Sequence, residues 1–294
     1  MIKSKLDYKC IKCLLERNLR IENLDIDEDI KTNYTKELIK IISDAPLKAS
    51  SPEISEKINK LQNKYNIHPF DWEKLKAYYN DLILKYEINV WENIINSDDS
   101  FKMAISYALI GNFIDFGANS KMTDENLISL IDDAKNVSFD NIEYKKLDEE
   151  LQSAQNVVYL LDNCGEIVFD KLLIKFILNK YPNIKIQTIV RGENILNDVT
   201  ADDAKQVGLD KITNIIPNGT AIAGTVLERI NKEALNVIEK ADVIISKGMG
   251  NFETLLGCNK NIYYIFMCKC EKFCRILNVP LYSYMLLNEK RTTI

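Results

Sequence analysis

The chain has 294 residues, 46% hydrophobic and 28% charged, and its 38 Lys and Arg against 43 Asp and Glu give a net charge of -5. This composition is typical of a globular protein that buries a sizeable core in one large domain or two modest ones. No basic block is present to face a phosphate backbone, and no apolar run approaches the roughly 20 residues that span a bilayer, so we expect neither a nucleic-acid nor a membrane partner.

The start of the chain and its sulfur and imidazole content restrict the chemistry further. The first residues, MIKSKLDYKC, are charged and lack an apolar signal region, which predicts a cytoplasmic protein. In that reducing compartment, the seven cysteines are expected to be thiols or metal ligands rather than disulfides. His68 is the single histidine, so a zinc hydrolase site with two or three imidazoles is excluded. A catalytic metal would need mostly oxygen or sulfur ligands.

The N-terminal half is predicted to be helical. All ten glycines lie at or after Gly111, and apolar side chains recur at spacings of three and four in residues 38–42 and 72–86. Pro or Asp near the start of a new helix predicts breaks at residues 51–53 and 68–71.

An apolar helix is predicted next, over residues 101–116. Asn112 and Asp115 are three positions apart, which places both side chains on one face of that helix. Two interpretations are open at this point: the pair points into a cleft, or it belongs to a helix end near Gly117.

The pattern changes near residue 155, where short β-rich runs begin to alternate with helix-like segments such as 167–181 and 221–240. Strands and helices that alternate at this spacing predict a parallel sheet with helices on both faces. We therefore expect an α/β protein with a helical region over residues 1–150 on one side of a cleft and an open α/β domain over residues 151–294. The predicted strands cover residues 157–161, 184–190, 212–216, 243–245 and 262–267.

Ligands bind beyond the carboxyl ends of the strands in an open parallel sheet. Asp162, Asn163 and Asp198 follow the first two predicted strands and offer the hard oxygen ligands that Mg²⁺ or Mn²⁺ prefers. Arg191 and Lys247 add positive charge, and glycines after the third and fourth strands let backbone N–H groups approach an anion. Taken singly, an Asp or Asn after a strand is more often a turn former or helix cap. Four such strand ends at one edge favour a metal and phosphate site.

Other nucleotide-binding and catalytic motifs match the sequence less well than a metal and phosphate site. Residues 248–250 begin like a dinucleotide fingerprint, but Glu253 stands where the third glycine belongs. A phosphatase that forms an aspartyl-phosphate on Asp162 would carry a second acid two residues later, where Cys164 stands. The chain has no Gly-x-Ser-x-Gly and no P-loop Lys-Ser/Thr pair. Attack by metal-activated water is therefore the simplest hydrolytic chemistry.

Six segments, in the same order along the chain, resemble the DUF89 family, also called the ARMT1-like or damage-control phosphatase family, and in particular its stand-alone prokaryotic branch with an N-terminal Cys pair. They are Cys10-Ile11-Lys12-Cys13, Gly111 to Gly117, Asp162 to Glu166, Arg191-Gly192 with Asn197-Asp198, Asn218-Gly219 with Gly224-Thr225, and Lys247 to Glu253. The resemblance implies a metal-dependent phosphatase of small phosphorylated metabolites, such as sugar phosphates or related esters. It also implies a helical region beside a Rossmann-like α/β domain.

The resemblance also implies roles for the matching residues. The metal, Mn²⁺, Co²⁺, Ni²⁺ or Mg²⁺, would be held by Asp162, Asn163 and Asp198. Lys247 matches the lysine that contacts the phosphate, and Asp115 and Glu253 are alternative candidates for the carboxylate that positions the attacking water. The residues expected to contact the substrate or its phosphate are Asn112, Glu166, Arg191, Gly219, Gly248 and Asn251.

The remaining cysteines and two other functional classes stay open. Cys10 and Cys13 form a CxxC pair, and a structural metal there would need two further ligands, whereas a redox pair or buried thiols are the alternatives. The further ligands would come from Cys268, Cys270 and Cys274, or from His68. The two other classes are a metabolite- or nucleotide-binding protein without catalysis and a carboxyl methyltransferase. The acidic loop after the first strand speaks against the methyltransferase.

Overall fold

The structure, a computed structural model, describes residues 6–112 and 124–292. Its sheet has the order β3-β2-β1-β4-β5-β6, and neighbouring strands are parallel except for the antiparallel pair of β5 and β6. This is a doubly wound arrangement: β2 and β3 are added on one side of β1, and β4 to β6 on the other, so the strand order reverses between β1 and β4. The strands are β1 (Asn156–Leu160), β2 (Lys185–Val190), β3 (Asn214–Pro217), β4 (Val243–Lys247), β5 (Ile262–Cys268) and β6 (Ser283–Asn288).

The five predicted strands are confirmed, and β6 at the edge of the sheet was not predicted. One predicted helix is wrong in its first half, because α11 spans only Lys232–Glu239. The preceding loop packs against the start of α12, where a Cβ atom on Gly250 would lie 2.1 Å from the carbonyl oxygen of Ala223. Asn231 then begins α11 as its N-cap by accepting a hydrogen bond from the backbone N–H of Ala234 at 2.9 Å.

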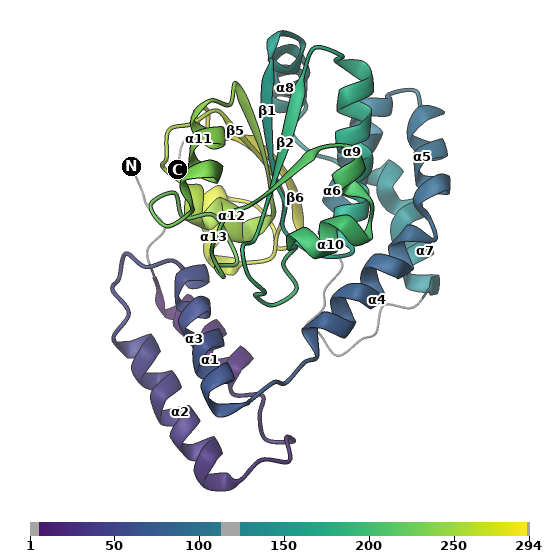
Figure 1. Cartoon of the computed structure of the whole chain (residues 1–294). Helices are drawn as coiled ribbons and strands as arrows, with labels where there is room; N and C mark the ends of the chain where they lie inside the picture. The colour runs from purple at the N-terminus through teal and green to yellow at the C-terminus, as the bar shows by residue number, and fades with distance from the viewer. Residues whose placement is uncertain (1–5, 113–123, 293–294) are drawn as a thin grey trace.

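Three N-terminal helices form a small bundle with a core of its own, which we call the cap (residues 6–67). It contains α1 (Tyr8–Asn18), α2 (Glu28–Ser43) and α3 (Ser51–Tyr65). Buried side chains such as Tyr34, Leu38 and Ile58 fill its centre. The predicted break before α3 is confirmed, with a capping box between Ser50 and Glu53. The cap projects from the body of the protein below the sheet (Figure 1).

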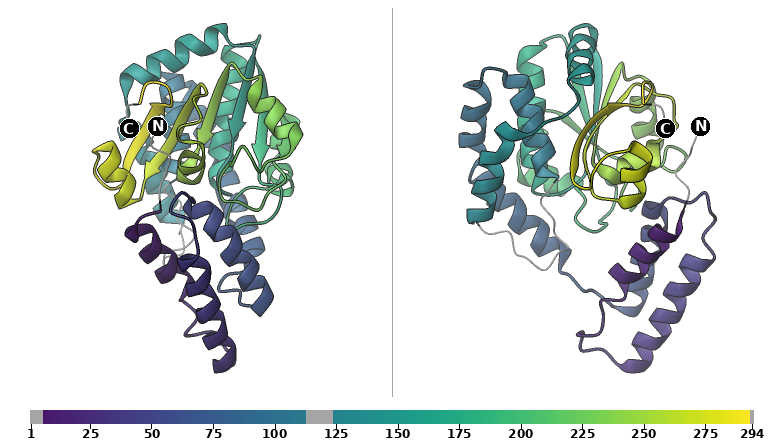
Figure 2. Two further views of the ribbon diagram at one scale, coloured as in Figure 1. Left: turned by 90° about the vertical axis from the view of Figure 1, so that its left-hand side faces the viewer. Right: turned by 180° about the vertical axis from the view of Figure 1, so that it is seen from behind.

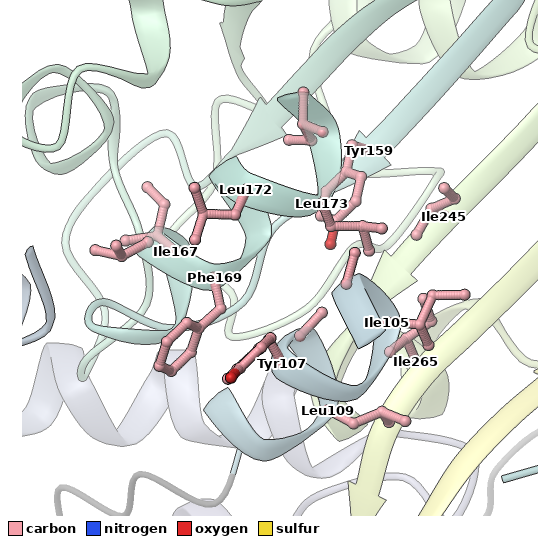
Figure 3. Packing of buried hydrophobic residues seen from close by; sticks show 14 of the residues in the cluster. Ile105, Tyr107, Leu109, Tyr159, Ile167, Phe169, Leu172, Leu173, Ile245 and Ile265 are labelled. Atoms are coloured by element: carbon pink, nitrogen blue, oxygen red, sulfur yellow. The ribbon is translucent and has the colours of Figure 1, made fainter. Parts of the chain in front are cut away.

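The other helices that precede β1 cover one face of the sheet, together with α9 (Glu166–Lys180), which follows β1, and α10 (Ala201–Gln206), which follows β2. Those that precede β1 are α4 (Trp72–Leu84), α5 (Glu87–Ile95), α6 (Ser100–Gly111), α7 (Asp124–Asp132) and α8 (Asn141–Ser153). Figure 3 shows the contact between α6 and α9, where the rings of Tyr107 and Phe169 stack with centroids 5.9 Å apart. Burial of these apolar surfaces fixes α9, and with it the loop after β1, against the sheet.

The opposite face carries α11, α12 (Gly248–Leu255) and α13 (Glu271–Leu277), as the two further views show (Figure 2). Phe252 of α12 lies at the centre of this layer, with its ring stacked on Phe266 of β5 at 4.8 Å between centroids. Helices on both faces of a mostly parallel sheet confirm the predicted α/β class. In the described part of the chain, we find no helix with the length and hydrophobicity that a membrane crossing requires.

Candidate active site

The three predicted metal ligands meet at the carboxyl ends of β1 and β2. Asn163 and Asp198 pair through a single antiparallel bridge, and the backbone N–H of Val199 donates to the carbonyl of Asp162 at 2.9 Å. The loops after β1 and β2 are therefore held side by side by backbone hydrogen bonds. All three side chains line a cavity of about 250 Å³ between the sheet and the cap. This is the crevice at the topological switch point, where open α/β sheets bind ligands.

A glycine at the end of β4 makes room for the first of these carboxylates. Gly248 has a φ of +77°, and a Cβ atom there would lie only 1.8 Å from Oδ2 of Asp162. The same oxygen accepts a hydrogen bond from Nδ2 of Asn163 at 2.6 Å. Gly248 therefore acts on the site by leaving space for the Asp162 carboxylate. From the sequence, we had expected it to offer a backbone N–H group to the phosphate.

We expect Gly248→Ala to displace the Asp162 carboxylate and weaken Mn²⁺ binding by about 10- to 100-fold, the usual cost of disturbing a residue next to a metal ligand. Gly257→Ala is the matched control, because Gly257 also has a positive φ, +84°, but has no atom within 4 Å of the added Cβ. Isothermal titration calorimetry with Mn²⁺ would compare the two variants. Equal Mn²⁺ affinities would contradict the steric role of Gly248.

Burial and charge act together on the two aspartates. Burial, followed by the charges of Asp198 and Glu166, raises the pKa of Asp162 well above its usual value. Burial likewise raises the pKa of Asp198, although Arg191 opposes the shift. Buried carboxylates that repel one another, and whose pKa values stay raised even beside Arg191, are stabilised by further positive charge, which a divalent cation would supply.

Arg191 joins the two aspartates from beneath the cavity. Its Nε donates to Oδ2 of Asp198 at 2.7 Å, and its Nη2 lies 3.5 Å from Oδ1 of Asp162. The side chain is 1% exposed, and Arg191 is not among the described residues that line the cavity. Its position indicates that it orients the two carboxylates. Because its guanidinium is buried and does not line the cavity, it would not contact a substrate there directly.

Lys247 is likewise buried, with a fully covered side chain. Its Nζ donates to the carbonyl of Ala108 at 2.7 Å, to Glu166 Oε1 at 2.5 Å and to Asp170 Oδ1 at 2.8 Å. Burial lowers the pKa of Lys247, but the two carboxylates outweigh it and the net shift is upward. The ammonium group therefore neutralises a buried acidic pair and does not line the cavity.

Glu166, one of the two carboxylates, connects Lys247 to the residues of the cavity. Its Oε2 accepts from Nδ2 of Asn163 at 3.1 Å and from Nδ2 of Asn112 at 3.0 Å. Nδ2 of Asn112 also lies 3.4 Å from Asp162 Oδ2, so this side chain points toward the loop after β1. Helix α6 ends at Gly111, and Asp115 lies outside the described residues.

The remaining predicted residues fall into two groups. Glu253 lines the cavity, and its Oε1 accepts a hydrogen bond from the backbone N–H of Ser51 at 3.1 Å, which ties α12 to the start of α3. Asn251 is buried and donates to the carbonyls of Leu161 and Lys247, so it fixes the loops after β1 and β4. Gly219 faces Asn231 and is not one of the described residues that line the cavity.

Residues of the cap close the cavity, and we did not predict them from the sequence. They come from α1 and α3. Positions 10, 13, 14 and 17 follow the spacing of one helix face, so the CxxC pair could have indicated that face. The lining residues of the cap are Cys10, Cys13, Leu14, Arg17, Ser51, Pro52 and Ser55.

The residues at the strand ends fit a hard divalent ion. Two carboxylates and an amide line the cavity together, and their oxygen atoms suit Mg²⁺ or Mn²⁺. Within residues 6–112 and 124–292, no three His, Cys, Asp or Glu side chains are grouped closely enough to hold a metal ion. The oxygen donors at the ends of β1 and β2 are instead two carboxylates and one amide. None of the seven cysteines, all of which lie in the described residues, forms a disulfide, and the Sγ atoms of Cys268 and Cys274 lie 3.4 Å apart.

Comparisons with known proteins agree in both sequence and structure. The family model of the damage-control phosphatase ARMT1-like domain matches residues 6–285. A damage-control phosphatase of Pyrococcus horikoshii is 31% identical over 293 residues, which cover 97% of this chain and 99% of that protein. Another, from Archaeoglobus fulgidus, is 30% identical over 282 residues and covers 94% and 96% of the two chains. The crystal structure of a DUF89 family protein from Pyrococcus horikoshii matches with a TM-score of 0.84 at 30% identity and covers 97% of this chain and 99% of that one.

Proposed function

The chain belongs to the damage-control phosphatase ARMT1-like family, and on this premise we propose that it is a metal-dependent phosphatase that hydrolyses phosphate monoesters of small metabolites, such as sugar phosphates. The observation that carries the proposal is that Asp162, Asn163 and Asp198 line one cavity of about 250 Å³. A cavity of this size suits a small phosphorylated molecule.

The donor set supports a role for a divalent ion. Such an ion would supply Lewis acidity, which polarises a phosphoryl oxygen and lowers the pKa of a water molecule. Asp162 and Asp198 would hold the ion with the amide oxygen of Asn163, and Arg191 would keep both carboxylates turned toward it. The hydrogen bonds from Arg191 to Asp198 and from Asn163 to Asp162 support this preorganisation.

The positioning of the attacking water falls to a carboxylate outside this set. Glu253 is the described candidate because it lines the same cavity as the proposed ligands. Its hydrogen bond to Ser51 holds one carboxylate oxygen in place, which would orient the group. Asp115 stays as the alternative assignment for this role.

The role that we propose for the buried Lys247 differs from the contact with phosphate that the family resemblance implies. Its three hydrogen bonds support a role in holding Glu166, and through Glu166 the amides of Asn112 and Asn163, at the floor of the cavity. We assign Lys247 to positioning of the site, because direct contact with the phosphate would require it to leave two buried carboxylates without a cationic partner.

The deciding experiment is phosphate release from a panel of sugar phosphates and other phosphate esters by the chelator-treated protein, with Mn²⁺, Co²⁺, Ni²⁺ or Mg²⁺ added separately. We expect release to depend on added metal, because the described residues that line the cavity include no histidine that would activate a nucleophile in its place. Full activity in chelator would contradict metal dependence. Saturable binding of the esters without release over long incubation would instead favour a metabolite-binding protein.

A further inference from the structure

The cavity at the strand ends is lined by more negative than positive side chains. Its acidic residues are Asp162, Asp198 and Glu253. Among the described residues that line it, Arg17 is the one cationic side chain. Arg191 and Lys247, the cations that the sequence indicated, are buried beneath the cavity and bound to carboxylates. A phosphate ester that enters therefore meets three acids and one guanidinium.

Arg17 reaches the cavity from the cap. It lies in the last turn of α1, on the helix face that also carries Cys10 and Cys13. Leu14, on the same face, is buried in the core of the cap and anchors this helix against α2 and α3. Arg17 lines the same cavity as the proposed ligands. Burial is the largest influence on the pKa of Asp198 and raises it, whereas the charge of Arg17 is among those that lower it.

We propose that Arg17 binds the phosphoryl oxygens of the substrate from the cap side of the cavity, opposite Asp162 and Asp198. This inference rests on the proposed phosphatase function and adds a substrate-binding residue to it. A guanidinium presents paired N–H donors whose geometry matches two phosphate oxygens, and it keeps its charge at every physiological pH. A divalent cation at the strand ends would neutralise part of the negative charge of the phosphate, and Arg17 on the cap side of the cavity would offset the rest.

The placement of Arg17 on α1 has a consequence for the cap. A phosphate held between α1 and the strand ends would connect the cap to the sheet, as the hydrogen bond from the Ser51 N–H to Glu253 already does. Loss of the Arg17 contact should therefore raise KM for the ester far more than it lowers kcat, because the metal ligands remain in place.

Binding of inorganic phosphate to the Mn²⁺-loaded protein tests the inference without relying on turnover. We expect Arg17→Gln to weaken phosphate binding by about 10- to 100-fold, the range for loss of a hydrogen-bonded charge, and Arg17→Lys to restore part of it. Lys12→Gln is the matched control, because Lys12 is on the same helix, is 68% exposed and pairs with Glu16. We expect the control to bind phosphate as the wild type does, and Mn²⁺ affinity to be kept in all variants.

Two results would overturn the inference. One is equal phosphate affinity in the wild type and Arg17→Gln; the other is no phosphate binding by the Mn²⁺-loaded wild type at millimolar concentration. The KM and kcat of the variants for an ester that the wild type hydrolyses separate this inference from the proposed function. A raised KM with kcat kept supports Arg17 as a binding residue. Phosphate binding that depends on Arg17, together with no hydrolysis of any ester, would contradict the phosphatase and leave Arg17 as an anion-binding residue.

Discussion

Asp162→Asn is expected to lower metal-stimulated phosphate release by about a thousandfold or more, since loss of a charged metal ligand removes several kcal/mol of transition-state stabilisation. The variant keeps an oxygen that can accept the hydrogen bond from Asn163, so the loop after β1 should keep its shape. Phosphate release at saturating Mn²⁺ and at saturating ester measures the loss.

The same variant should remain folded, which separates loss of activity from loss of structure. The pKa of Asp162 is raised by burial and by the nearby carboxylates. An ionised carboxyl with a raised pKa destabilises the fold above its unfolded-state pKa, so at neutral pH the neutral amide should be at least as stable in the absence of metal. Mn²⁺ should raise the melting temperature of the wild type, as a ligand specific for the folded state does, and have little effect on that of Asp162→Asn.

Asp202→Asn is the control for this experiment. Asp202 is 94% exposed and pairs with Lys205 on the surface of α10, so its loss should change neither turnover nor the effect of Mn²⁺ on melting. If Asp162→Asn keeps metal-stimulated turnover, the assignment of Asp162 as a ligand is wrong.

Lys247→Met is expected to destabilise the protein by about 3 to 5 kcal/mol, the cost of leaving a buried charge without its partner. The ammonium group faces Glu166 and Asp170, both fully buried. Burial raises the pKa of Asp170 to about 7 even with Lys247 and the Tyr159 hydroxyl beside it, so loss of the ammonium group would leave the charged carboxyl poorly compensated. Urea unfolding followed by circular dichroism measures the free energy of unfolding.

A triple variant keeps this prediction testable if Lys247→Met alone does not fold. Adding Glu166→Gln and Asp170→Asn removes the unpaired charges, and we expect most of the lost stability to return. The hydroxyl of Tyr159, which donates to Asp170 in the wild type, would still have an acceptor in the amide oxygen that replaces that carboxylate. No recovery in the triple variant, or full stability of Lys247→Met, would contradict the charge-pair role of Lys247.

Much of the fold follows from local sequence patterns. Five strands, the helices between most of them and the break before α3 are predictable because alternation of apolar residues and helix caps are local properties. The edge strand β6 and the loop before α11 were missed. Each depends on a distant partner: β6 pairs with β5, and Gly224 and Ala223 pack against Gly250 and Thr254 of α12.

For the site, the meeting of Asp162, Asn163 and Asp198 was predictable from the sequence, because parallel strands end at one edge of a sheet and these residues follow adjacent strands. The positions of the cations were not predictable, because they depend on contacts between distant segments. Lys247 ends β4, and its direction depends on Glu166 and Asp170 in α9, which no local pattern reveals. Arg17 reaches the same cavity only because the cap packs over the strand ends, and contacts between such distant segments are fixed by packing, not by sequence spacing.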